Sequence, residues 1–101
     1  MIDYINDIIK KIYNIKHIFY VDNKIYDKEK KDILILINTV YEECANCCDK
    51  QVIIEINENG KHIIEALTYK DDLQLIDILE NETINIMKEL LNIIVGYKYE
   101  E

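Results

Sequence analysis

The chain has 101 residues, of which 50% are hydrophobic and 32% are charged. This is long enough to bury one core and too apolar for a disordered chain, so we expect a single domain over residues 1–101. The formal net charge is −8 and arginine is absent, so the excess of acids over lysines disfavours binding to nucleic acids and anionic membranes.

The N-terminal half predicts two helices joined by an ambiguous segment. Residues 18–26, which are β-branched and aromatic around an Asp-Asn turn signal, fit either a short strand pair or a loop. A helix is predicted over residues 29–48, where hydrophobic residues recur at three- and four-residue steps. The same spacing predicts an amphipathic helix over residues 2–16, with its apolar face formed by Ile5, Ile8, Ile9, Ile12 and Ile15.

Residues 51–69, with the sequence QVIIEINENGKHIIEALTY, predict a β-hairpin. Two runs rich in β-branched residues flank Asn59-Gly60, which is a strong hairpin-turn signal. With a three-residue loop over residues 58–60, the outer face of the hairpin would carry Ile53, Glu55, Ile63 and Glu65.

The C-terminal third predicts two further helices. Asn81 is expected to separate them and to cap the second, and Gly96 to end or kink it. The whole order indicates an α+β fold. It consists of a small antiparallel hairpin or sheet at about residues 51–69, which residues 18–26 could extend, packed against three to four helices.

The cysteines Cys44, Cys47 and Cys48 fall within five positions, and the chain has no others. On a helix they would share one face, where they could begin a zinc site with His17 or His62 as the fourth ligand. Only one half of such a site is present, however, and it continues an apolar stripe. We therefore interpret the cluster as core packing, assign no metal and no cofactor, and keep a metal-responsive role as an alternative.

Negative charge is concentrated in the second half of the chain. Residues 1–54 hold nine acids and eight lysines, whereas residues 55–101 hold eleven acids and four lysines. If the hairpin and the last two helices pack together, their carboxylates could form one surface for a basic protein. The candidate partner-binding residues are Glu55, Glu58, Glu65, Asp71, Asp72, Asp77, Glu80 and Glu82.

These features predict a small acidic protein-binding module that inhibits or neutralises a basic partner, including one that itself binds nucleic acid. Serine is absent and no P-loop, dinucleotide fingerprint or metalloprotease helix occurs, so we expect no enzyme and no catalytic residue. The abundance of isoleucine, asparagine and tyrosine indicates an AT-rich genome. A phage-borne inhibitor of a host defence nuclease and a toxin immunity protein both fit.

Two further expectations concern location and assembly. The start of the chain has acids where a signal peptide has basic residues, and no apolar run is long enough to span a membrane. We therefore expect a cytoplasmic protein that contacts neither membrane nor nucleic acid directly. The alternative function is a self-associating structural or regulatory subunit, a homodimer formed through Ile53 and Ile63.

Overall fold

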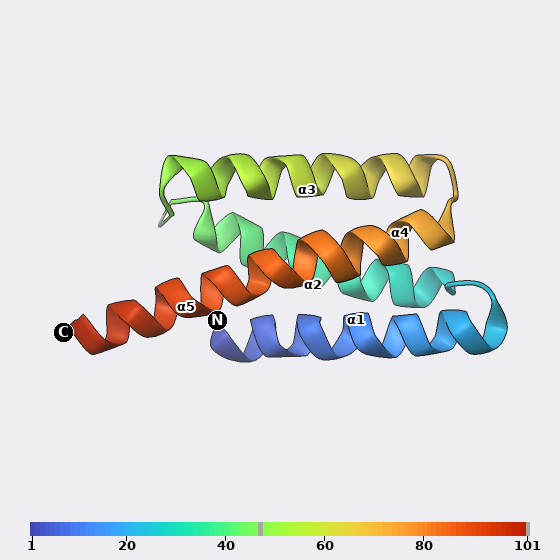
Figure 1. The fold of residues 1–101 in the computed structure, drawn as a ribbon, viewed down its shortest axis with the longest axis horizontal. Helices are drawn as coiled ribbons and strands as arrows, with labels where there is room; N and C mark the ends of the chain where they lie inside the picture. Colours follow the sequence, from blue (N-terminus) through green and yellow to red (C-terminus); the bar gives the residue numbers. More distant parts are fainter. Residues whose placement is uncertain (47, 101) are drawn as a thin grey trace.

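The computed structural model of the chain is a helical bundle (Figure 1). It describes residues 1–46 and 48–100, with the side chains of residues 97–100 outside the description. In chain order the helices are α1 (Ile2–Asp22), α2 (Asp27–Cys44), α3 (Lys50–Thr68), α4 (Asp72–Ile78), the π-helical turn η1 (Leu79–Thr83) and α5 (Ile84–Glu100).

The elements α4, η1 and α5 continue one another as a single helical rod. The bundle therefore consists of α1, α2, α3 and this rod. Helix α1 packs against both α2 and α5, and α3 packs mainly against α4. The rod crosses the bundle diagonally from the end of α3 toward the start of α1 (Figure 1). Helix α3 is therefore close to the rod at its C-terminal end and diverges from it toward its N-terminal end.

One hydrophobic core runs along the bundle and receives residues from every helix. The helices predicted over residues 2–16 and 29–48 are confirmed in type, although α1 continues to Asp22 and α2 ends at Cys44. The buried positions on these two helices keep the predicted three- and four-residue steps: Ile5, Ile8, Ile12, Ile15, Ile33, Ile37, Val40, Tyr41 and Cys44.

The predicted hairpin over residues 51–69 is wrong, because this segment is the continuous helix α3. Its N-terminus is capped by Asp49, whose side chain accepts a hydrogen bond from the backbone N–H of Val52 at 3.0 Å. The β-branched residues mislead because their spacing also fits a helix: the buried positions are Val52, Ile56, Asn59, Ile63 and Ala66. Tertiary packing of this face overrides the local turn and strand signals.

With the hairpin gone, the predicted α+β class is also wrong: residues 1–46 and 48–100 contain helices, turns and bends, and no strand. The 18–26 segment completes α1 and then turns at Asn23, whose left-handed backbone (φ 58°) ends the helix. The homodimer surface expected at Ile53 and Ile63 also fails, because Ile63 points into the core and is only 2% exposed.

The predicted break at Asn81 is wrong as well. This residue lies inside η1, where the rod continues through a wider turn: the backbone N–H of Ile84 bonds to the carbonyl of Leu79, five residues earlier. The Asn81 side chain donates to Asp77 at 2.7 Å on the exposed side of the rod. Gly96 likewise lies within α5.

Across the described residues, every helix is too short or too polar to cross a membrane.

Candidate functional site

A buried hydrogen-bond network at the middle of α3 links this helix to α2 and to the rod. We call it the Asn59 tie, and it consists of Asn59, Tyr41 and Thr83. Asn59 is 1% exposed, and its Oδ1 accepts a hydrogen bond from the hydroxyl of Tyr41 on α2 at 2.7 Å. Its Nδ2 donates to Oγ1 of Thr83 at the end of η1, at 2.9 Å. Burial raises the pKa of Tyr41 far above its ordinary value, so the hydroxyl stays protonated and serves as a donor.

The π-helical turn η1 presents two consecutive side chains to α3. Thr83 bonds to Asn59, and Oε1 of Glu82 lies 2.9 Å from Nδ1 of His62. The hydrogen bond and charge of Glu82 raise the pKa of His62 above its ordinary value. π-helical turns are frequent at functional sites, and here the turn supplies two side chains that bond to Asn59 and His62 of α3.

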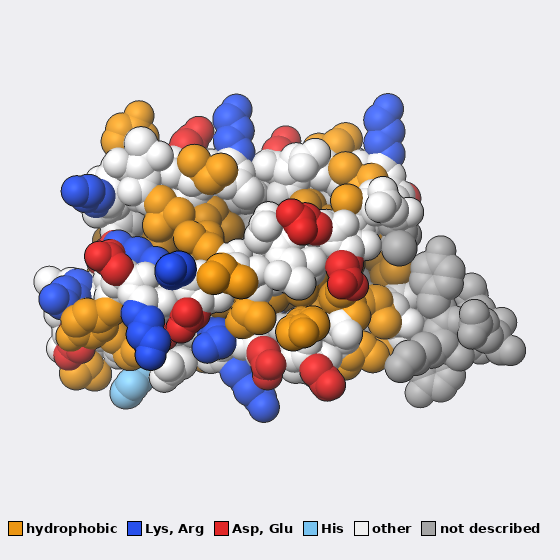
Figure 2. All heavy atoms as spheres, turned by 180° about the vertical axis from the view of Figure 1, so that it is seen from behind, with side chains coloured by type: hydrophobic (Ala, Val, Ile, Leu, Met, Phe, Trp, Pro, Cys, Tyr) orange, Lys and Arg blue, Asp and Glu red, His pale blue; other side chains and the backbone are white. Residues whose placement is uncertain are grey.

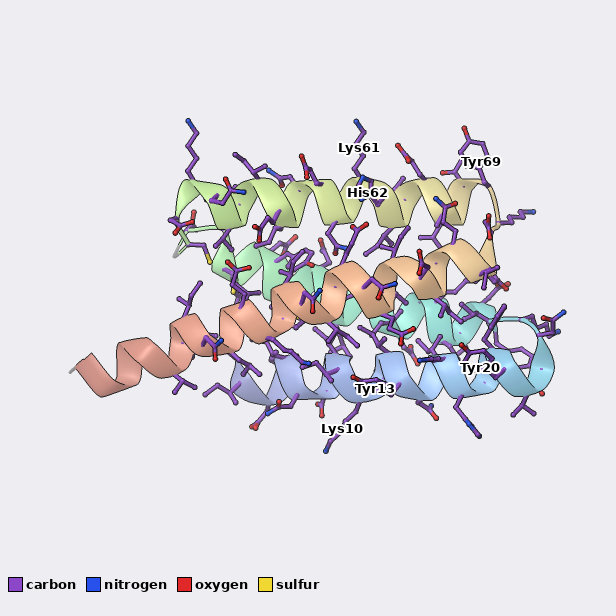
Figure 3. All side chains as sticks on the ribbon, in the orientation of Figure 1. Lys10, Tyr13, Tyr20, Lys61, His62 and Tyr69 are labelled. Carbon is purple, nitrogen blue, oxygen red and sulfur yellow. The ribbon has the colours of Figure 1, made fainter. Side chains whose placement is uncertain are left out.

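Beyond this tie α3 and α5 diverge, and a groove of about 440 Å³ opens between them. The acidic groove, as we call it, is lined by four carboxylates and a few neutral side chains: Glu55, Glu58, Asn59, His62, Glu82, Asn85, Ile86 and Glu89. No lysine is among these lining residues. In Figure 3, Lys61 projects outward from α3, away from the rest of the bundle.

The two ends of the acidic groove carry different electrostatics. At one end Glu89 and Glu55 line the groove together, and the neighbouring carboxyl group of Glu55, together with burial, raises the pKa of Glu89 above its ordinary value. At the other end Glu82 is balanced by His62. The Glu55 and Glu89 end therefore holds uncompensated negative charge at neutral pH.

The structure brings together three of the eight predicted binding residues, Glu55, Glu58 and Glu82, and adds Glu89 to them. The other five lie elsewhere. Glu65 lies on the far side of α3, Asp71 caps α4 by accepting from the backbone of Gln74, and Asp77 holds Asn81. Glu80 forms an ion pair with Lys16, and Asp72 forms one with Lys30 at 2.8 Å.

A second groove runs along the opposite side of α3, between α3 and α2, which make few close contacts with each other. It holds two adjoining cavities of about 720 Å³ and about 270 Å³. We call it the apolar groove, because isoleucines, Leu34, Ala45, Tyr41 and Gly60 form most of its lining. In Figure 2, which views this side, hydrophobic side chains gather between the upper edge of the molecule, formed by α3, and its middle.

The cysteines do not form a site in the described part of the chain. Cys44 is buried in the core at the end of α2, and Cys48 packs against the core from the following turn. Cys47 lies outside the described residues. Among residues 1–46 and 48–100, no three His, Cys, Asp or Glu side chains are arranged to hold a metal ion.

Comparison of the chain with models of protein families, with curated proteins and with solved structures gave no match.

Sequence reasoning missed the Asn59 tie and Gly60 because both residues had been assigned to a turn. A signal was present: Asn59 is one step of the helical series Val52, Ile56, Ile63, in which a polar residue marks a buried hydrogen bond. The apolar groove had no comparable signal, since it depends on how far α2 and α3 stand apart.

Proposed function

We propose that this chain is a non-enzymatic acidic binding module, and that the acidic groove receives basic side chains of a partner protein. The observation that carries the proposal is that Glu55, Glu58, Glu82 and Glu89 line one groove with no lysine among its lining residues, and that Glu55 raises the pKa of Glu89. Two carboxylates of which one raises the pKa of the other oppose folding when both are ionised, and a cation from outside would relieve this repulsion.

The rest of the groove supports the same reading. Glu58 is exposed on α3, so a cation that enters meets carboxylates from both helices. The walls are fixed, because the Asn59 tie holds α3 at one end of the groove. A groove with fixed, convergent carboxylates favours the forked guanidinium of arginine, which can bond two of them at once.

The overall charge of −8 adds long-range attraction for a basic protein. A partner whose basic surface normally binds nucleic-acid phosphates would be blocked by such a chain, which is the mode of action that we infer for a cytoplasmic inhibitor or immunity protein.

The test is a comparison of two equally charged double variants. Glu55→Gln with Glu89→Gln neutralises the acidic groove, whereas Asp3→Asn with Asp7→Asn removes the same charge from the exposed face of α1. Each immobilised protein is incubated with lysate from an AT-rich bacterium at about 50 mM and about 300 mM salt, and the retained proteins are identified by mass spectrometry.

We expect a basic protein that the wild type and the α1 variant retain at low salt, that is lost at high salt, and that the groove variant does not retain. Retention of the same protein by the groove variant, or a partner that is acidic or insensitive to salt, would contradict the proposal.

A further inference from the structure

The apolar groove between α2 and α3 offers a second binding surface, separate from the acidic groove. Its two cavities share Asn38, Tyr41, Gly60 and Ile64, so they form one continuous channel. Ile64 is 65% exposed beside this channel although it is a large aliphatic residue. An elongated hollow lined by isoleucines is the kind of surface that an amphipathic helix covers.

Gly60 is a feature of the apolar groove at which a partner could approach α3 closely. It lies in the middle of the helix, where glycine destabilises relative to alanine. Its backbone does not have positive φ, and a Cβ added at this position would meet nothing within 4 Å. The space beside Gly60 is therefore open, and the missing side chain leaves room for a partner backbone to lie against α3.

The dimensions fit one short helix. The lining extends on α2 from Leu34 to Ala45 and on α3 from Ile53 to Glu65. At a rise of 1.5 Å per residue these stretches are about 16 Å and about 18 Å long, which corresponds to three turns of an α-helix.

Charge selects the kind of helix. The ionisable residues of the lining are Glu42 and Glu65, with Lys61 as the cation, and the chain as a whole carries −8. Basic residues beside the apolar stripe of an incoming helix would meet these carboxylates, whereas acidic residues would be repelled.

A second copy of the chain is a poor occupant. Its charge repels the first copy. The exposed large hydrophobic residues of the described chain are scattered over helices and turns, and no helix carries three of them at three- and four-residue steps: Tyr4, Tyr13, Tyr20, Val21, Tyr26, Ile35, Ile54, Ile64, Tyr69, Leu73 and Val95.

We propose that the apolar groove binds one amphipathic helix of a partner protein, about three turns long, with aliphatic residues on one face, lysine or arginine beside them, and its backbone close to Gly60. Only the basic character of this helix is shared with the proposed function; the groove, its lining and its occupant are independent of Glu55 and Glu89.

The test uses three synthetic fluorescent peptides of about 18 residues, long enough to form a helix. The first is built from leucine, lysine and alanine with the leucines on one helical face. The second has the same composition with the leucines spread around the helix, and the third replaces lysine by glutamate. Fluorescence anisotropy measures their affinity for the wild type, for Gly60→Leu, which fills the groove, and for Gly60→Ala.

We expect the first peptide to bind the wild type about tenfold or more tighter than the other two, and to lose about tenfold with Gly60→Leu. Gly60→Ala should weaken binding by less while raising the Tm, so that lost affinity cannot be ascribed to lost stability. The paired variant Glu55→Gln, Glu89→Gln should keep the preference for the first peptide over the second, which separates this groove from the acidic one.

Equal binding of the first two peptides, or unchanged affinity in Gly60→Leu, would overturn the helix-binding groove. Equal binding of the glutamate peptide would overturn the basic character of the occupant. A wild-type dimer in analytical ultracentrifugation that Gly60→Leu dissociates would assign the groove to a second copy and overturn the proposal.

Discussion

Glu55 on α3 and Glu89 on α5 line the same acidic groove, and the carboxyl group of Glu55 raises the pKa of Glu89. The two residues are far apart in the sequence, and the packing of α3 beside the rod places both of them in this groove. Repulsion between the two carboxylates lowers the free energy of unfolding, and binding sites commonly contain such destabilising features.

Replacing Glu89 by glutamine should therefore stabilise the protein at pH 7, by about 0.3–0.5 kcal/mol, the size of a like-charge pair at a helix surface. A carboxyl whose pKa is raised by folding contributes stability below its unfolded pKa and loses it as the pH rises through the folded pKa. The advantage of Glu89→Gln should thus shrink as the pH falls from 7 toward 4.5, the ordinary pKa of this group.

Urea unfolding at several pH values measures this difference. Asp7→Asn, which removes an exposed charge from α1, serves as the control. A stability gain of equal size and equal pH dependence in Asp7→Asn would show that net charge, and not the carboxyl group of Glu55, is responsible.

The Asn59 tie gives a second prediction. Asn59→Ala leaves the buried hydroxyls of Tyr41 and Thr83 without their partner, which costs the desolvation of each group as well as the hydrogen bonds. We expect a loss of about 2–4 kcal/mol in the free energy of unfolding. Asn57→Ala, a change at an exposed position on the same helix, should cost less than about 1 kcal/mol.

Urea denaturation with circular dichroism as the readout compares the two variants. Equal losses in the free energy of unfolding of Asn59→Ala and Asn57→Ala would mean that the hydrogen bonds of Asn59 do not stabilise the packing of α2, α3 and η1.

His62 provides a pH-dependent test of the contact between α3 and η1. Since Glu82 raises the pKa of His62 in the folded protein, the pair contributes stability that is complete below pH 6.5, the ordinary pKa of histidine, and is lost as the pH rises through the folded pKa. His62→Gln should therefore be less stable than the wild type at pH 5.5 and approach it at pH 9. NMR titration of the imidazole and thermal unfolding at both pH values measure the effect.

His17→Gln removes the exposed histidine of α1 and is the matched control. A stability loss for His62→Gln that stays constant from pH 5.5 to pH 9 would assign the loss to packing and not to the ion pair with Glu82.

The sequence predicts the helices that have a regular apolar stripe and misassigns the one in which β-branched residues surround Asn59-Gly60. The stripes of α1 and α2 are long and unbroken, so burial of one face decides their structure. In α3 the local turn signal competes with an equally regular helical series, and only the partners of Asn59 on other helices decide the outcome. Those partners cannot be identified from one chain segment.

The acidic groove could be predicted from the sequence only in part, again because its geometry depends on contacts between helices. The excess of acids after residue 55 is a property of composition, and three of the predicted acids, Glu55, Glu58 and Glu82, line one groove between α3 and the rod. Which acids converge depends on η1, because a turn with one more residue rotates everything that follows it. Asp72 and Glu80 lie in the same acidic region but pair with lysines of α2 and α1, which no spacing rule indicates.

Asp72 leads to the last prediction, because it links the α1–α2 turn to the start of α4. Its Oδ2 accepts from the backbone N–H of Ile25 at 2.9 Å, and its Oδ1 lies 2.8 Å from Nζ of Lys30. Burial raises the pKa of Asp72, but these two hydrogen bonds and the lysine charge outweigh burial, so its pKa lies below the ordinary value.

Asp72→Asn should destabilise the protein by about 1–2 kcal/mol at pH 7, because the amide keeps at most one of the two charge-assisted bonds. The contribution of Asp72 is present above its unfolded pKa of 3.8 and is lost as the pH falls through the lower folded pKa. The gap between wild type and variant should therefore close below pH 3.8 in acid unfolding followed by circular dichroism, with Asp7→Asn as the control. A gap that persists in acid would mean that the shape of the side chain, and not its charge, holds the turn to α4.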